Sequence, residues 1–284
     1  MDYLEYDPEE LQQVQKIELG ILDDFIEICD KNHISYFMCG GTSIGIAREG
    51  RMIPWDDDID VGLLRKDYDR LKEIIITEYN DKYDFVDPLL YEDYFAMNAH
   101  ICLKGTIFEE YSGIGLNYPK GIFLDIFPFD NISDDDSRLK KDGWKVWKLH
   151  KILTLIMIEK PVIYQKGLFA KTIRLICSIL HKILVLLKIS PLKLKERIDK
   201  IVKRYKDEDT KRVAFYFDPK NPFTSLLYKT EIMPLKKVDF QNRKVFIINN
   251  IYAYLKRRYP NWRQVPKEED RHNHKPYKLE FKNE

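Results

Sequence analysis

The chain has few cysteines, and none of them form a close pair. Cys29, Cys39, Cys102 and Cys177 are spread over the sequence. This spacing argues against a zinc knuckle and does not suggest a disulfide framework. Two disulfides are possible on number alone, but a reduced, cytoplasmic chain is the better expectation.

The chain also lacks an excess of either charge, and its first residues are not expected to act as a signal peptide. Lysine and arginine number 47 against 46 aspartates and glutamates, so no overall field favours nucleic acid as a partner. The first ten residues are acidic and polar, unlike a signal peptide. Hydrophobic residues make up 44% and charged residues 33% of the 284 positions, which is typical of a globular protein with one large or two small domains.

The apolar spacing predicts an α/β protein with a mixed sheet, followed by a mainly helical part. Helices are expected over 8–31, 42–49, 66–79, 137–158, 168–188, 191–205 and 249–258. Strands are expected over 33–39, 59–64, 83–86, 95–104, 106–111, 122–129, 212–217 and 244–248. The expected parts are a catalytic core over 1–135 and a mainly helical part that binds substrate or acceptor over 136–284. The residues after 258 are expected to form a polar tail.

The most informative segment is an acidic run that enters a strand. Asp56, Asp57, Asp58 and Asp60 place four carboxylates within five positions. Carboxylates this close repel one another, and a strand that carries them into a core needs compensation. Divalent Mg²⁺ or Mn²⁺ is the natural partner for such hard oxygen ligands.

Strand geometry assigns roles within this run. Asp58 and Asp60 are two residues apart, so both point to one face of a strand. Asp56 shares their parity and is a further candidate ligand, whereas Asp57 is expected to face away. Asp125 is an isolated carboxylate in the apolar stretch 122–127, which is costly unless it is paired or bound to metal. If the two strands are neighbours, Asp58, Asp60 and Asp125 converge on one point. A solvated acidic loop is the competing interpretation of the run.

Two glycines precede the acidic run. Gly40 and Gly41 stand between an expected strand and an expected helix capped by Thr42 or Ser43, where the backbone can approach a phosphate closely. Arg48 lies about two helical turns further on and is a candidate phosphate ligand. A simple turn for the glycines and a surface salt bridge for Arg48 are the alternatives.

These motifs resemble the LicD family, which includes phosphocholine transferases and, more distantly, fukutin-type ribitol-phosphate transferases. The resemblance rests on residues 40–45, Arg48, residues 53–60, residues 121–130 and, more loosely, residues 234–238, 249–259 and 266–274. Two departures concern the C-terminal blocks: Pro260-Asn261 stand where the family often has Gly-Asp, and Asn273 separates His272 from His274.

The resemblance implies a nucleotidyltransferase-like fold and a CDP-linked donor. In the phosphocholine branch the donor is CDP-choline. The acceptor is a sugar hydroxyl of a cell-surface glycan, such as lipopolysaccharide or a teichoic-acid-type or lipid-linked precursor, and CMP is released. By this interpretation Asp58, Asp60 and Asp125 are catalytic and bind metal with Asp56, while Gly40, Gly41, Thr42 and Arg48 contact the donor. A nucleotidyltransferase that moves a nucleoside monophosphate, and a non-catalytic scaffold, are the alternatives.

Three further features have weaker interpretations. The segment 168–189 carries many leucines and isoleucines with five basic or histidine residues and no acidic residue. It is expected either to lie on an anionic membrane surface, at its inner face, or to be an ordinary buried helix. Trp55 is expected to fix the acidic loop, although a choline-binding cage would need aromatic residues. His272 and His274 are expected to be idle, and Lys236 and Lys237 are weak phosphate candidates.

Overall fold

The fold is α/β, built on one mixed sheet. The computed structural model describes residues 6–281 apart from 160–166, 219–220 and 272. The sheet has seven strands: β1 (Phe37–Met38), β2 (Asp60–Leu64), β6 (Phe123–Ile132), β4 (Ala99–Leu103) and β3 (Tyr83–Val86) in that order, with β7 (Arg212–Ala214) on β6 and β8 (Leu226–Tyr228) on β7. The pair β2–β6 is parallel, and the other pairs are antiparallel. The expected fold class is therefore confirmed.

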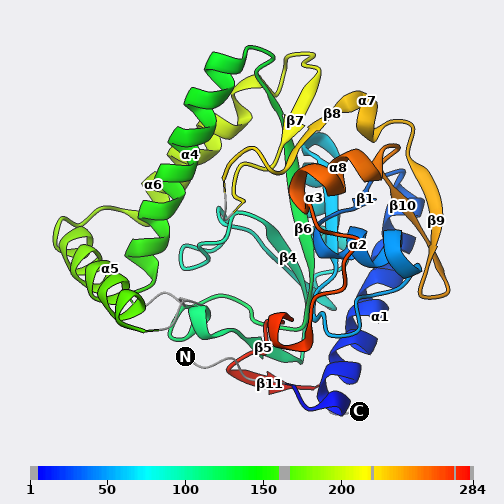
Figure 1. Cartoon of the computed structure of the whole chain (residues 1–284), viewed down its shortest axis with the longest axis horizontal. Coiled ribbons are helices and arrows are strands. Elements are labelled where there is room, and N and C mark those ends of the chain that lie inside the picture. The colour runs from blue at the N-terminus through cyan, green and yellow to red at the C-terminus, as the bar shows by residue number, and fades with distance from the viewer. Residues whose placement is uncertain (1–5, 160–166, 219–220, 272, 282–284) are drawn as a thin grey trace.

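Helices gather on two sides of this sheet (Figure 1). On one side of the view lie α1 (Pro8–Asn32), α2 (Gly40–Glu49), α7 (Lys229–Ile232) and α8 (Ile251–Arg258), and on the other α4 (Asp136–Met157), α5 (Leu168–Leu186) and α6 (Pro191–Val202). Helix α3 (Arg65–Glu78) packs against β2, β3 and β6. Short 3-10 turns cover Tyr111–Gly113, Lys203–Tyr205 and Glu268–Asp270.

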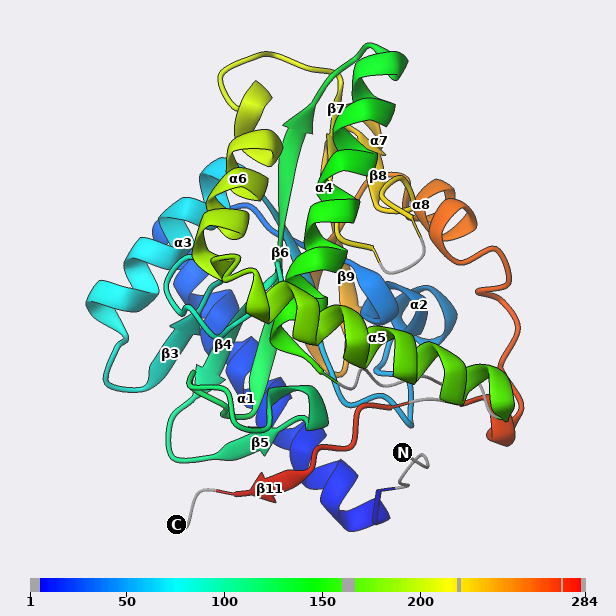
Figure 2. The ribbon, with the colours of Figure 1, turned by 90° about the vertical axis from the view of Figure 1, so that its left-hand side faces the viewer.

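Two small antiparallel pairs complete the fold. One joins β9 (Lys236–Phe240) to β10 (Arg243–Ile247), and the other joins β5 (Ile107–Glu109) to β11 (Lys278–Glu280). The second pair corrects the expected polar tail, because the end of the chain returns along the molecule and pairs with β5 (Figure 2). This return brings the segment before β11 against the acidic run.

The longest expected helices form where the spacing places them. Helix α1 starts at Pro8, with the Asp7 side chain accepting from the Glu9 amide, and buries one apolar stripe. It ends at Asn32, and the cap residue His33 has a left-handed φ of 53° that closes the last turn. The strand expected over 33–39 is therefore reduced to Phe37–Met38.

The end of β6 ties both expected parts of the chain together. The strand expected over 122–129 extends further, because β6 continues to Ile132 and pairs there with β7 from beyond residue 135. Asp130 is buried and accepts two hydrogen bonds of 2.7 Å from the Arg65 guanidinium. The pair fixes α3 on the sheet.

Candidate active site

Three carboxylates meet at the junction of β2 and β6. In the parallel register Asp60 stands directly beside Asp125, and Asp58 lies two residues before Asp60. One oxygen from each of Asp58, Asp60 and Asp125 lies within 4.8 Å of the others. The convergence expected from strand parity is present in the structure.

Burial and mutual repulsion make this cluster unfavourable without a counter-charge. Asp60 is 7% exposed, and burial followed by the charges of Asp58 and Asp125 raises its pKa well above the usual range. Burial likewise raises the pKa of Asp58 to about 6, against the opposing effect of His274. Three hard oxygen donors with unbalanced charge fit a divalent cation such as Mg²⁺ or Mn²⁺. These residues could therefore hold a metal ion.

Asp125 has two partners that the sequence did not reveal. His100 pairs with it across β4–β6 and places Nε2 3.0 Å from Asp125 Oδ1. Asn98 Nδ2 donates to the same oxygen at 2.5 Å. Burial works against a charged imidazole, but the Asp125 carboxylate outweighs it and raises the pKa of His100 to about 10. These contacts fix the orientation of the Asp125 carboxylate.

The two glycines allow Asp60 to approach α2. Gly40 has φ of +50°, and a Cβ there would collide with the Asp60 carboxylate. The Gly41 amide donates to Asp60 Oδ2 at 2.6 Å, and the Gly40 amide donates to the Tyr254 hydroxyl at 3.0 Å. Both glycines line the cavity beside the cluster. Asp60 thus occupies the N-terminus of α2, where the helix dipole favours an anion.

The residues after the glycines have structural partners. Helix α2 begins at Gly40, and neither Thr42 nor Ser43 caps it, since its N-cap residue is Cys39 without a side-chain bond. Thr42 Oγ1 accepts from the Asp60 amide at 2.8 Å and so fixes β2 against the helix. Arg48 Nε and an Arg48 terminal nitrogen donate to the carbonyls of Trp262 and Gln264, both at 2.6 Å. Its guanidinium therefore holds the C-terminal segment instead of facing the carboxylates.

The C-terminal segment contributes a histidine that the sequence analysis treated as idle. His274 Nδ1 lies 3.3 Å from Asp57 Oδ1 and 3.7 Å from Asp58 Oδ2. Its amide donates to Asp57, which also accepts from the Tyr6 hydroxyl at 2.9 Å. The hydrogen bond to Asp57 is the main cause that raises the pKa of His274 to about 11. His272 lies outside the described residues.

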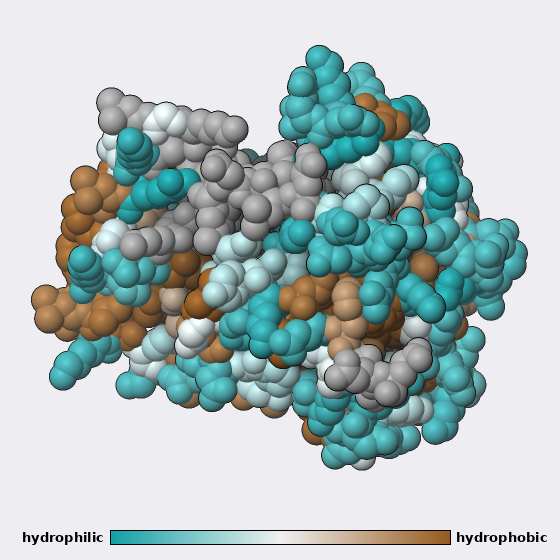
Figure 3. Space-filling model, turned by 90° about the horizontal axis from the view of Figure 1, so that it is seen from below, coloured by the Kyte–Doolittle hydropathy of each residue, from teal (hydrophilic) through white to brown (hydrophobic). Residues whose placement is uncertain are grey.

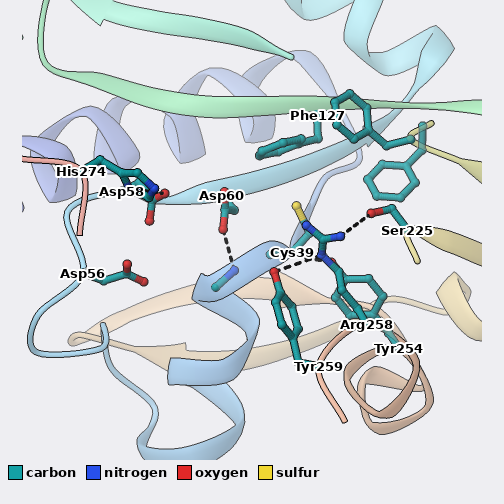
Figure 4. Close-up of a pocket in the computed structure, with 14 residues that line it drawn as sticks. Cys39, Asp56, Asp58, Asp60, Phe127, Ser225, Tyr254, Arg258, Tyr259 and His274 are labelled. Carbon is teal, nitrogen blue, oxygen red and sulfur yellow. Dashed lines mark hydrogen bonds and ion pairs between the residues drawn. The ribbon is translucent and has the colours of Figure 1, made fainter. Parts of the chain in front are cut away.

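One cavity, of about 300 Å³, opens on the Asp60 side of the cluster. Figure 4 shows Asp58 and His274 at one end and Arg258, Tyr254 and Tyr259 at the other. Arg258 ion-pairs with Asp218 and donates to Ser225 Oγ at 3.0 Å. Further aromatic residues, Phe127, Phe129 and Phe215, also line the cavity, and Asp56 lies at its edge. The cavity thus combines a cation, aromatic faces and carboxylates.

A second cavity, of about 270 Å³, opens on the Asp125 side. Asp58 and His274 line both cavities, whereas Asp60 lines only the first and Asp125 only the second. The cluster therefore lies where the two cavities meet. Such an arrangement can hold the two parts of a substrate on either side of a charged linkage.

Comparison with known proteins agrees with the sequence motifs. Residues 33–157 match the family described as LicD/FKTN/FKRP, nucleotidyltransferase domain. The lipopolysaccharide cholinephosphotransferase LicD of Haemophilus influenzae is 27% identical over 93% of this chain and 95% of its own. An uncharacterized protein of Rickettsia prowazekii is 36% identical over 19% of this chain and 21% of its own. An uncharacterized protein of Rickettsia typhi is 34% identical over 19% of this chain and 18% of its own.

The matched range contains the structural elements of the carboxylate cluster. Strands β2 and β6, with Asp58, Asp60 and Asp125, all fall within 33–157, whereas His274 and Arg258 lie outside it. Residues 33–157 of this chain are therefore similar to the nucleotidyltransferase domain of the LicD/FKTN/FKRP family.

Proposed function

We propose that the protein transfers phosphocholine from CDP-choline to a sugar hydroxyl of a cell-surface glycan and releases CMP. The observation that carries this proposal is the position of Asp58, Asp60 and Asp125 at the junction of two cavities. Similarity over almost the whole length to a lipopolysaccharide cholinephosphotransferase supports the transferred group and the acceptor class. A lipid-linked or teichoic-acid-type precursor belongs to the same acceptor class.

The carboxylate cluster would hold one or two divalent cations. Bound Mg²⁺ or Mn²⁺ supplies positive charge that neutralises the pyrophosphate and the departing CMP. Asp58, Asp60 and Asp125 would be the ligands, with Asp56 at the edge of the first cavity. His100 and Asn98 hold Asp125 in place, and the Gly41 amide holds Asp60. The protein contributes mainly orientation, which is a large part of phosphoryl-transfer catalysis.

The first cavity suits the nucleotide half of the donor. Arg258 would contact a phosphate or the base, because a guanidinium binds such oxygens in a fixed, two-pronged geometry. The rings of Tyr254, Tyr259 and Phe127 offer faces for the cytosine. Asp58, at the end of this cavity, then lies beside the linkage that breaks.

A donor comparison tests the reaction. The wild type is incubated with Mg²⁺ or Mn²⁺ and CDP-choline, CDP-ribitol or CDP-glycerol in the presence of a lipopolysaccharide acceptor. We expect CMP release and labelled acceptor with CDP-choline, and loss of at least about 100-fold in rate for Asp58→Asn. Release of pyrophosphate from a nucleoside triphosphate would support a nucleotidyltransferase instead. No turnover with any donor would support a scaffold.

Helix α5 supports a membrane-bound acceptor. Leu175, Leu186 and Leu187 are 62%, 81% and 64% exposed, and five further apolar side chains of this segment are also exposed: Ile176, Ile179, Leu180, Ile183 and Val185. Figure 3 shows this apolar area at the left edge of the molecule, where α5 lies in Figure 1. Ser178 and His181 hold the other face of α5 through Glu159 and the Leu155 carbonyl.

The basic residues around this apolar surface indicate which kind of membrane it would bind. Lys171, Lys182 and Lys188 are exposed along α5 and its end, and 168–189 contains no acidic residue. Among the described residues no single helix has the length and apolarity to cross a bilayer. The segments Lys171–Leu186 and Pro191–Tyr205, which are joined at a sharp bend, have that length and apolarity only when taken together. We propose that α5 lies on an anionic membrane surface, as a basic amphipathic helix does.

Vesicle flotation tests this surface. We expect the protein to float with phosphatidylglycerol vesicles and not with phosphatidylcholine vesicles. Leu175→Gln with Leu186→Gln should abolish flotation, while Ile76→Gln, which changes an exposed residue of α3, should not. Equal flotation of the double variant would contradict the proposal.

A further inference from the structure

Five aromatic rings form part of the wall of the second cavity. Tyr94, Phe95, Phe108, Tyr118 and Phe123 border it, together with Ala96, Ser112 and the polar groups of the cluster. The rings support one another: the Tyr94 centroid lies 5.2 Å from that of Tyr118, and that of Phe108 lies 5.3 Å from that of Phe123. The His100 ring stacks on that of Phe123, with 3.9 Å between the two ring centroids. The wall is therefore rigid before any ligand enters.

One carboxylate in this cavity accepts no hydrogen bond from any described residue. Asp57 and Asp125 accept hydrogen bonds, and Asp58 lies near His274. Within the described ranges the Glu110 side chain makes no hydrogen bond or ion pair, although it is partly buried and lines the cavity. The adjacent Glu109 differs, because it pairs with Lys120 at 2.6 Å. The Glu110 carboxylate is thus free of hydrogen bonds from the described residues beside aromatic rings, and the charges of His100 and His274 act on it from beyond ion-pair distance.

Two nitrogen donors of the lining are already used by the cluster. His100 Nε2 and Asn98 Nδ2 are both used by Asp125 Oδ1. The Tyr94 hydroxyl is buried without a hydrogen-bond partner among the described residues. A polyol needs several donors and acceptors, whereas an alkylated ammonium needs ring faces and one negative charge.

The geometry points to this cavity, with Glu110 and Phe95 among its walls, as the binding site for the quaternary ammonium of the transferred group. This inference rests on the proposed function and adds the residues that select the alcohol. Asp58 and Asp125 border both the cavity and the cluster, so a choline bound there has its phosphate next to the carboxylates. The nucleotide then extends into the first cavity, on the Asp60 side.

Two variants and a matched control test the inference. Glu110→Gln removes the charge at constant size, and Phe95→Leu removes a ring face and keeps the side chain apolar. Glu109→Gln removes the neighbouring charge, which does not line the cavity. We expect the KM for CDP-choline to rise about tenfold or more in the first two variants, with the inhibition constant of CMP and the KM of the acceptor unchanged. The control should behave as the wild type.

The outcomes separate the inference from the proposed function. An unchanged KM for CDP-choline in both variants, weaker CMP inhibition, or a raised KM of the acceptor alone would overturn the assignment. Calorimetry with phosphocholine and phosphoethanolamine gives a readout that needs no turnover. The wild type could release no CMP and still bind phosphocholine more tightly than phosphoethanolamine. If Glu110→Gln then loses this preference, the proposed reaction is wrong but the binding site is supported. Equal binding of the two ligands would overturn the site.

Discussion

Asp60 and Asp125 stand side by side in the parallel register of β2 and β6. Parallel neighbours on a sheet point to the same face, so each brings its carboxylate toward the other from a rigid backbone. Asp58 completes the group within 4.8 Å. Folding therefore holds together three groups that repel one another, which is an arrangement typical of a functional site.

Neutralising one member of this cluster should stabilise the protein when metal is absent. In chelator-treated buffer we expect Asp60→Asn to raise the free energy of unfolding by about 1–3 kcal/mol, because one repelling charge is removed. The asparagine oxygen can still accept from the Gly41 amide. Denaturant unfolding of both proteins measures the change.

A buried carboxylate with good partners provides the contrast. Asp87 accepts from Tyr68 and pairs with Lys72 at 3.1 Å. Burial opposes its charge, but Lys72 and these bonds lower its pKa. Asp87→Asn should therefore lower stability. If Asp60→Asn lowers stability as much as Asp87→Asn does, repulsion in the cluster is not significant.

Arg258 should control nucleotide affinity. We expect Arg258→Lys to weaken CMP binding about tenfold, or about 1.4 kcal/mol, since the lysine cannot reproduce a two-pronged contact. Arg257→Lys is the control, because Arg257 pairs with Glu231 at 2.7 Å and does not line the cavity. Calorimetric titration with CMP compares the two. Similar affinities for both variants would remove Arg258 from the site.

His274 should support turnover through its charge. The imidazolium lies beside Asp57 and Asp58, and a pKa of about 11 keeps it charged at neutral pH. We expect His274→Gln to lower kcat by about 10- to 100-fold, in the range seen for residues that support metal ligands. Lys278→Gln, on exposed β11, should retain full activity. A fully active His274→Gln protein would show that the histidine only holds the C-terminal segment against the acidic run.

Acid should destabilise the fold through His150. Burial, and then the charge of Lys151, lowers the pKa of His150 from 6.5 to about 4. Between these pH values the unfolded chain binds more protons than the folded one, so stability falls as the pH drops from 6.5 to 4, by at most about 1.4 kcal/mol per pH unit. Above pH 6.5 this contribution is constant.

The variant His150→Phe isolates this effect from carboxylate titration. Urea unfolding at pH 6.5, 5.5 and 4.5 should give a steeper loss of stability for the wild type than for the variant. Equal slopes for the two proteins would show that His150 titrates normally in the folded state.

The carboxylate cluster was accessible from the sequence because its signal is local. The alternation of Asp58, Ile59, Asp60 and Val61 fixes which face each side chain takes once a strand forms. The lone Asp125 identifies the second strand by its apolar neighbours. Helices with long apolar periodicity, such as α1 and α4, were predicted within a few residues of their bounds.

The other site residues depend on contacts that no local pattern encodes. His100 reaches the cluster through the register of β4 on β6, and His274 through the pairing of β11 with β5 far along the chain. Arg258 lies in the last turn of α8, among three consecutive basic residues that differ only in their tertiary contacts. Arg48 was a candidate phosphate ligand with a salt bridge as the alternative, and its hydrogen bonds to the carbonyls of residues 262 and 264 could not be foreseen.

Binding of Mn²⁺ tests the central claim most directly. Electron paramagnetic resonance of free Mn²⁺ counts the ions taken up by the wild type, Asp60→Asn and Asp125→Asn, with Glu109→Gln as a control that keeps the cluster. We predict saturable binding to the wild type and the control, and affinity at least about tenfold weaker in both aspartate variants. Wild-type affinity in Asp60→Asn and Asp125→Asn would contradict the assignment of these carboxylates to a metal.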